Sequence, residues 1–319
     1  MNVSELSKKI LEGDIRSASR AIRNIEDGVA SKKQLIKHIF PHTGNAHIAG
    51  FTGSAGAGKS TIIDELIAHY RGREDKSIGV MAVDPTSPYT GGAILGDRIR
   101  MQRHAEDPNV FLRSLATRGA LGGLSTAVGD AVHIMDAMGK DKIVIETVGT
   151  GQQEVEIMNY AHTVIVVLVP GMGDDIQVIK AGIMEIGDIF VINKADRDGS
   201  QKLYNGIKNM LDMANFKDGE WRPPVLMLES VQNLAKFSSE VENVAENMDA
   251  HYHYLVDKDS LSDRVRHNAK HEMICALKEA ILNPVLNELI ESGKFERMVD
   301  QLISKASDPY SLAEEIAGR

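Results

Sequence analysis

Short apolar runs recur between residues 45 and 235 and alternate with segments in which apolar residues return at helical spacing. The runs are continuous stretches rich in valine and isoleucine, without strict alternation of apolar and polar residues. Strands that are buried on both faces have this pattern, which is typical of parallel sheets covered by helices. We therefore predict an α/β fold with a mostly parallel β-sheet, whose strands lie at 46–51, 78–83, 142–146, 163–169, 188–193 and 224–228.

The two ends of the chain lack such runs and are predicted to be helical. Apolar residues return at helical spacing on both sides of Gly13-Asp14, and again after Ser238, where Pro284 is expected to end or kink a long helix. These stripes must be buried against the core or against another subunit. We predict an N-terminal helical extension at 1–44, an α/β domain at 45–237 and a C-terminal helical arm at 238–319.

The stretch Gly53-Ser54-Ala55-Gly56-Ala57-Gly58-Lys59-Ser60 matches the phosphate-binding pattern G-x-x-x-x-G-K-[ST]. It lies between a predicted strand and a helical segment, which is the context that the pattern requires. Glycines let backbone N–H groups converge on a polyphosphate, and the helix adds its N-terminal amides. Lys59 is expected to reach the β- and γ-phosphates and Ser60 to ligate Mg²⁺, with Thr61 as a further nucleotide contact. A flexible Gly/Ala/Ser turn is the alternative.

Acidic residues lie at or just after the ends of two of the predicted strands. Asp84 comes after the run that ends at Val83, and Glu146 comes after Ile145, while Asp97 lies further along the chain. Because parallel strands deliver their carboxyl ends to one crevice, these carboxylates are candidates to hold Mg²⁺ together with Ser60. Alternatively, each caps the helix or turn that follows it.

The tetrapeptide Asn193-Lys194-Ala195-Asp196 follows another predicted strand and matches the pattern N-K-x-D. A carboxylate at Asp196 can accept hydrogen bonds from both N1–H and the exocyclic N2–H₂ of guanine, whereas adenine offers no such donor pair. The Lys194 stem can lie over the base, and Asn193 can tie this loop to the phosphate side. The sequence therefore predicts GTP or GDP as the bound nucleotide.

The composition adds limits on partners and compartment. The 319 residues include 36 basic and 45 acidic residues, a formal charge of −9 that offers no general attraction to nucleic acid or to anionic membranes. The single cysteine, Cys275, indicates a reducing compartment and leaves no disulfide framework. No signal peptide and no apolar run of roughly 18–20 residues is evident. We predict a cytoplasmic protein without nucleic-acid or membrane partners.

These motifs occur in the order found in one known family. Together with the phosphate loop and Asn193–Asp196, the segments Asp84-Pro85-Thr86-Ser87, 90–101, 118–124 and 146–152 make the chain similar to the methylmalonyl-CoA mutase-associated GTPases of the MeaB/ArgK type. The resemblance covers nearly the whole chain. It places Lys59, Ser60, Asp84, Asp97 and Glu146 at phosphate and Mg²⁺ positions, and Asn193, Lys194 and Asp196 at the guanine site.

The resemblance also implies a function that the residues alone do not. Members of this family are G-protein chaperones that use GTP hydrolysis to gate delivery of adenosylcobalamin to a B12-dependent acyl-CoA mutase and to protect or reactivate that enzyme. It further implies a homodimer built through the C-terminal helices, with a cobalamin adenosyltransferase as a second partner. Asp174, Gln177 and Lys180 fall on the family's mobile switch, so Gln177 and Lys180 join Lys59 and Asp84 as catalytic candidates.

The chain departs from the family pattern at two places, and its motifs are compatible with several alternative functions. Glu229-Ser230-Val231 stands where such GTPases carry a Ser-Ala pair, so support for the guanine carbonyl is expected to be weaker or differently built, and Ala55 replaces a common proline. The alternative functions are an ATP-driven subunit for basic amino-acid transport, a nucleotide-gated scaffold and a small-molecule kinase. The pairs His251/His253 and His267/His271 are read as solvated or packed side chains in preference to metal ligands.

Overall fold

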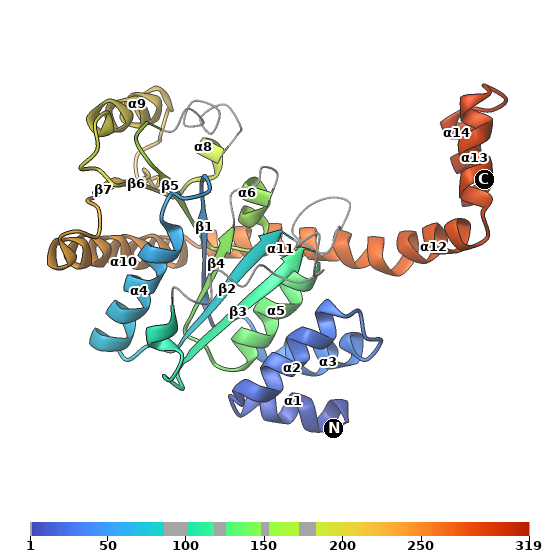
Figure 1. Ribbon diagram of the computed structural model, residues 1–319, viewed down its shortest axis with the longest axis horizontal. Coiled ribbons are helices and arrows are strands. Elements are labelled where there is room, and N and C mark those ends of the chain that lie inside the picture. Colours follow the sequence, from blue (N-terminus) through green and yellow to red (C-terminus); the bar gives the residue numbers. More distant parts are fainter. Residues whose placement is uncertain (1, 86–100, 118–125, 148–152, 172–182, 319) are drawn as a thin grey trace. The chain divides into compact units, whose positions relative to one another are not determined.

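A parallel sheet forms the centre of the larger of two compact units (Figure 1). The computed structural model describes residues 2–85, 101–117, 126–147, 153–171 and 183–318, and the units are Met1–Asn268 and Ala269–Arg319. Within the described residues, seven strands pair in parallel in the order β3-β2-β4-β1-β5-β6-β7. They are β1 (His47–Thr52), β2 (Ile78–Pro85), β3 (Val110–Thr117), β4 (Lys142–Thr147), β5 (Thr163–Leu168), β6 (Ile189–Asn193) and β7 (Val225–Leu228).

Helices precede, connect and follow these strands. The chain begins with α1 (Val3–Leu11), α2 (Ile15–Glu26), α3 (Lys32–Ile39) and the 3-10 turn η1 (Phe40–His42). Between and after the strands lie α4 (Lys59–Arg73), η3 (Gln102–His104), α5 (Thr126–Ala137), α6 (Gln153–Glu156), η4 (Ile157–Asn159), α8 (Ile183–Ile186), α9 (Ser200–Met213) and α10 (Leu234–Asp257). The predicted α/β architecture is confirmed.

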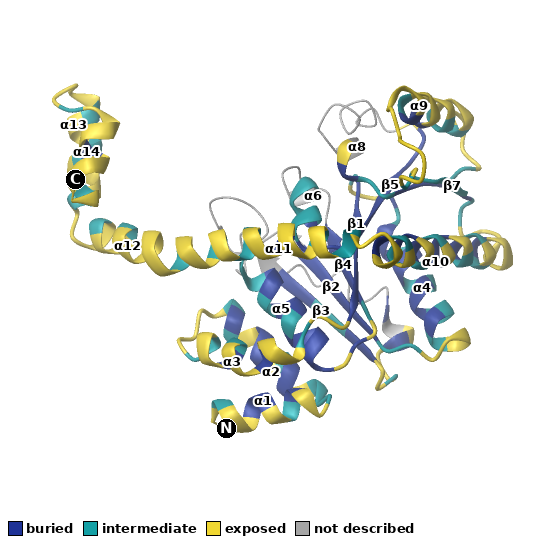
Figure 2. Cartoon of the chain, turned by 180° about the vertical axis from the view of Figure 1, so that it is seen from behind, coloured by how far each residue is buried: buried dark blue, intermediate teal, exposed yellow. Residues whose placement is uncertain are grey.

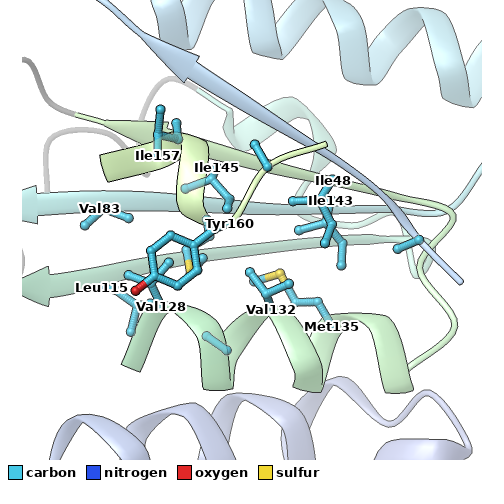
Figure 3. Close-up of a cluster of buried hydrophobic side chains, with 14 of the residues drawn as sticks. Ile48, Val83, Leu115, Val128, Val132, Met135, Ile143, Ile145, Ile157 and Tyr160 are labelled. Atoms are coloured by element: carbon cyan, nitrogen blue, oxygen red, sulfur yellow. The ribbon is translucent and has the colours of Figure 1, made fainter. Parts of the chain in front are cut away.

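Both faces of the sheet are covered, which explains why its strands are continuous apolar runs. On one face, Val128, Val132 and Met135 of α5 pack against Ile143 and Ile145 of β4 (Figure 3). On the other face, α4 and α10 bury a second cluster. Its members on these two helices are Ile62, Ile63, Leu66, Ile67, Tyr70, Phe237, Val241, Val244, Ala245 and Met248. β1 and β2 are accordingly dark blue along most of their length in Figure 2.

The N-terminal helices pack on the outside of α5, with α2 and α3 both in contact with that helix. A buried carboxylate secures the junction between this extension and the sheet. Asp136 of α5 accepts hydrogen bonds from the backbone N–H groups of Gly44 (2.6 Å), Asn45 (3.2 Å) and Ala46 (3.2 Å). The chain therefore enters β1 in a defined position, and the predicted helical N-terminus is confirmed.

Among its described residues, the smaller unit consists of helices joined by short turns. It contains the end of α11 (Ser260–Leu277), a π-helical turn η5 (Lys278–Leu282), α12 (Asn283–Glu291), α13 (Lys294–Ile303) and α14 (Pro309–Ala317). The expected interruption at Pro284 takes the form of the π-helical turn, after which Pro284 occupies the first turn of α12, where its missing N–H removes no helical hydrogen bond. Among the helices described, none combines the length and apolarity required to cross a membrane.

One strand was missed by the sequence patterns. β3 lies at the end of the sheet, and its apolar residues are interrupted by Arg113 and by Ser114, which gives no continuous run. Arg113 forms an ion pair with Glu26 of α2 at 2.6 Å. The six predicted strands are all present, whereas the proposed domain limits at 44 and 237 remain predictions.

Candidate nucleotide-binding site

The phosphate loop connects β1 to α4 in a conformation that requires glycine. Gly53 has a φ of +133°, and a Cβ there would lie 2.0 Å from the carbonyl oxygen of Val167 on β5. Gly58 has a φ of +90°, and its Cβ would lie 2.2 Å from Nδ2 of Asn193. The loop therefore lies directly against the neighbouring strand and against the first residue of the predicted guanine motif.

Lys59 and the start of α4 face the inside of this loop. The Lys59 side chain is buried, and its Nζ donates to the carbonyl oxygens of Gly53 (2.6 Å) and Ser54 (3.0 Å). The helix begins after Gly58, which provides no side-chain cap, so the positive end of the helix dipole is directed into the loop. A cation and a helix N-terminus converging on a glycine cradle fit a polyphosphate.

Two of the four predicted Mg²⁺ ligands are in contact. Ser60 Oγ donates to Glu146 Oε1 at 2.7 Å, and both side chains are buried. Glu146 reaches this position because β4 pairs in parallel with β1, with Glu146 opposite Phe51. Hydroxyl and carboxylate oxygens are ligands that Mg²⁺ accepts, so the pair fits that ion.

The other two predicted ligands are placed less completely. The backbone of Asp84 lies at the same carboxyl edge, because the preceding Val83 pairs with Thr147 of β4, but its side chain lies outside the described residues. Asp97 lies wholly outside them. In the described ranges, no three His, Cys, Asp or Glu side chains cluster in a way that would hold a metal.

The predicted guanine motif follows β6 and is attached to the phosphate loop at two points. Asn193 is buried, and its Nδ2 donates to the carbonyl oxygen of Ala57 at 2.7 Å. Lys194 adopts a left-handed backbone conformation with φ +57°, and its Nζ donates to the carbonyl oxygen of Gly56 at 2.9 Å. Burial, with a contribution from Arg197, lowers the pKa of Lys194. The loops predicted to bind base and phosphate therefore form one connected structure.

Asp196 is oriented by a residue that the sequence reasoning did not assign. Its Oδ1 accepts the backbone N–H of Ser230 at 2.7 Å, and its Oδ2 accepts the Ser230 hydroxyl at 3.0 Å. The backbone hydrogen bond from Ser230 is the main cause of the lowered pKa of Asp196, so the exposed carboxylate is held ionised. The departure noted at Glu229–Val231 thus retains a serine that positions Asp196, and the available signal was a serine just after the last strand.

The other candidate residues either lie outside the described part of the chain or make contacts away from the site. Asp174, Gln177 and Lys180 lie in 172–182, outside the described part of the chain. His251 is buried and hydrogen-bonds Thr163 Oγ1 through Nδ1 at 2.9 Å. His267 Nε2 lies 3.0 Å from Oδ1 of Asn159. Both histidines make polar contacts with neighbouring side chains, and the expectation that they are not metal ligands stays a prediction.

Comparison with known proteins adds independent evidence. A family model described as methylmalonyl Co-A mutase-associated GTPase MeaB matches residues 18–289. A Pyrococcus horikoshii protein, provisionally named a GTPase, is 46% identical over 323 residues, covering 99% of each chain. The GTPase ArgK of Escherichia coli is 32% identical over 311 residues, covering 94% of this chain and 90% of ArgK. A crystal structure described as an LAO/AO transport system kinase aligns with a TM-score of 0.72 at 22% identity, covering 100% of this chain and 98% of that one, which shows a shared fold.

Proposed function

The chain belongs to the family of methylmalonyl-CoA mutase-associated GTPases of the MeaB type, and from this membership we propose that it acts as a G-protein chaperone for a B12-dependent acyl-CoA mutase. As a member of that family it is a GTPase. In the proposal, its GTP cycle gates adenosylcobalamin delivery to a mutase of the methylmalonyl-CoA type and protects or reactivates that enzyme. A cobalamin adenosyltransferase is included as a further partner.

One observation carries the nucleotide assignment: the phosphate loop and the Asp196 carboxylate belong to one hydrogen-bonded unit, joined through Asn193 and Ala57. GTP phosphates would occupy the loop from Gly53 to Thr61. Lys59 would exchange its two carbonyl partners for phosphate oxygens. Charged phosphate oxygens are better acceptors for an ammonium group than neutral carbonyl oxygens. Asp196 would accept the guanine N–H pair while Ser230 holds its orientation.

The Mg²⁺ ion would be held by Ser60 and by the carboxylates of Glu146, Asp84 and Asp97, and when bound it neutralises charge that develops on the phosphates. Lys59 stabilises the same charge from the loop side. We assign Gln177 and Lys180 to the catalytic group on the basis of the family resemblance. In this proposal the mutase orders their segment, so hydrolysis is slow without the partner and faster with it.

The remaining parts of the proposal are a cytoplasmic location and a homodimer formed through the C-terminal helices. Apolar side chains on these helices support the dimer, since Ile281, Ile290 and Ile303 are 62%, 60% and 73% exposed. Large exposed aliphatic side chains on successive helices are typical of a surface that is covered in the assembled protein.

A second candidate is an ATPase subunit for basic amino-acid transport. The name of the related LAO/AO transport system kinase is the observation that favours it. This function predicts a preference for ATP. Asp196 argues against it, because an adenine base would leave the oriented carboxylate opposite an acceptor nitrogen with no donor pair.

Nucleotide titration separates these functions. We expect purified protein to bind labelled GTP at least about a hundredfold more tightly than ATP, since a bound adenine would cover the Asp196 carboxylate without offering it a donor pair. Asp196→Asn should weaken GTP binding and favour xanthosine nucleotides. Asp198 is an exposed aspartate in the same loop, and Asp198→Asn should leave the affinity for GTP unchanged. Equal affinity for ATP and GTP would refute the guanine assignment.

The chaperone role is tested with the partner enzyme. Purified methylmalonyl-CoA mutase should raise the GTP hydrolysis rate, and cobalamin loading of the mutase should depend on GTP. Full loading with a nonhydrolysable GTP analogue would instead support the scaffold alternative. No change in either rate would contradict the proposed role.

A further inference from the structure

Three successive residues at the end of β7 and just after it contact the guanine motif and α10 in alternation. The carbonyl oxygen of Leu228 accepts the backbone N–H of Ala195 at 2.8 Å. The backbone N–H of Glu229 donates to Oε2 of Glu240 on α10 at 2.7 Å. The next residue, Ser230, donates twice to Asp196. Asp196 is therefore connected to α10 through two adjacent residues of one chain segment.

Glu240 is a well-fixed acceptor for this segment. Its side chain is 20% exposed and lies on the second turn of α10, a helix that buries Phe237 and Val241. A hydrogen bond from a backbone N–H to a carboxylate is stronger than one to a neutral oxygen. Because α10 is fixed by its buried face, its carboxylate defines where the backbone of Glu229 lies.

A cation on the same helix completes the arrangement. Lys236, one turn before Glu240, has its Nζ 4.0 Å from Glu240 Oε1 and forms an ion pair with the carboxylate of Glu229. Asn233 caps the helix by accepting the N–H of Lys236 at 3.2 Å. The first turns of α10 thus hold both the backbone and the side chain of Glu229.

We propose that Glu240 is a positioning residue for guanine recognition: by holding the N–H of Glu229 it fixes Ser230, and Ser230 in turn fixes the Asp196 carboxylate. This inference rests on the proposed GTP site. Glu240 acts on the base and not on the phosphates, so GTP and GDP are affected alike. Base contacts are the same in the ground state and in the transition state, so kcat is unchanged while Kd and KM rise.

The test compares two variants that cannot accept the hydrogen bond with one that can. Glu240→Ala and Glu240→Met, the second of which keeps the side-chain length, should each weaken GTP and GDP binding about tenfold. ATP affinity and kcat at saturating GTP should stay within about twofold of the wild type. Glu240→Gln retains an acceptor oxygen and should restore most of the affinity.

Two controls test whether the effect of Glu240 on guanine binding passes through Asp196. Glu242 also lies on α10 but pairs with Arg73 of α4, so Glu242→Ala should leave guanine affinity unchanged. In an Asp196→Ala background, Glu240→Ala should cause no further loss, because its effect passes through that carboxylate.

Three results would overturn the inference, given circular dichroism spectra that show folded variants. They are wild-type GTP affinity in both Glu240→Ala and Glu240→Met, an equal loss of GTP and ATP affinity, or an additive effect in the Asp196→Ala background. Failure of the proposed function gives a different outcome, in which the wild type itself does not prefer GTP to ATP.

Discussion

Lowering the pH from 7.5 to 5 should destabilise the core, because three histidines are buried at the amino ends of the strands, opposite the nucleotide site. His47 begins β1, His162 precedes β5, and His251 of α10 lies against them. They are only 3%, 8% and 1% exposed, respectively. Protonating any of them places a charge in the interior, where its loss of hydration is costly.

The hydrogen bonds assign neutral tautomers to two of these rings. Lys142 Nζ lies 3.2 Å from Nδ1 of His47 and can only donate, so His47 carries its proton on Nε2 and donates to Thr163 Oγ1 at 2.9 Å. The Thr163 hydroxyl then donates to Nδ1 of His251 at 2.9 Å. This leaves the His251 proton on Nε2, which faces Asp188 Oδ1 at 3.4 Å. In this arrangement each of the two rings carries one proton and is neutral.

The size of the destabilisation follows from the pKa values of the buried histidines. Burial lowers the pKa of His47 to about 4 and that of His162 to about 3, and it also lowers the pKa of His251. The unfolded chain therefore binds more protons, so stability is complete above pH 6.5 and falls as the pH drops towards the folded-state values. At pH 5, His47 and His162 each lower the free energy of unfolding by about 2 kcal/mol, or by about 4 kcal/mol together. Burial raises the pKa of Asp249, but the hydrogen bond from Lys142 outweighs this and lowers that pKa to about 2, so the carboxylate affects stability only below about pH 4.

Urea unfolding at pH 7.5, 6 and 5 measures this effect. Trp221 is the only tryptophan, and its ring centroid lies 4.8 Å from that of His251, so its fluorescence reports on this region directly. His162→Gln should reduce the pH dependence by about half, whereas His253→Gln, at an exposed position of α10, should not change it. A free energy of unfolding that is constant within about 1 kcal/mol between pH 7.5 and 5 would refute the reasoning.

Two substitutions test other parts of the structure. Gly58→Ala should weaken GTP binding by more than about tenfold in a nucleotide titration, because the new Cβ would displace Asn193. Gly139→Ala is the control, since Gly139 has a φ of +77° and no atom within 4 Å of the position of a Cβ. It should cost only about 1–2 kcal/mol of backbone strain and leave GTP binding intact. Asp136→Ala should lower the free energy of unfolding by about 3 kcal/mol in urea titrations, because three backbone N–H groups, including that of Gly44, lose a buried acceptor. Asp136→Asn keeps an acceptor oxygen, so a smaller loss of stability would support this reasoning. Equal stability of the wild type and both variants would contradict it.

The sequence predicted most of the fold because burial on both sides of a sheet leaves a direct record in a strand. β5 reads Thr163-Val164-Ile165-Val166-Val167-Leu168, and every residue in it is buried. β3 left no such record, since Arg113 forms its ion pair with α2 in the middle of the strand. The order of the strands was equally unreadable, because no local pattern states which strand pairs with which.

By itself, the sequence determined the phosphate loop and the N-K-x-D motif, since both depend on a few adjacent residues and on the backbone freedom of Gly53 and Gly58. Only the tertiary structure decided which distant groups complete them. Ser60 meets Glu146 across 86 positions, and Ser230 meets Asp196 across 34, because parallel pairing brings the carboxyl ends of β1, β4, β6 and β7 to one edge. Contacts of this kind are set by the register and order of strands, which arise from packing the whole chain.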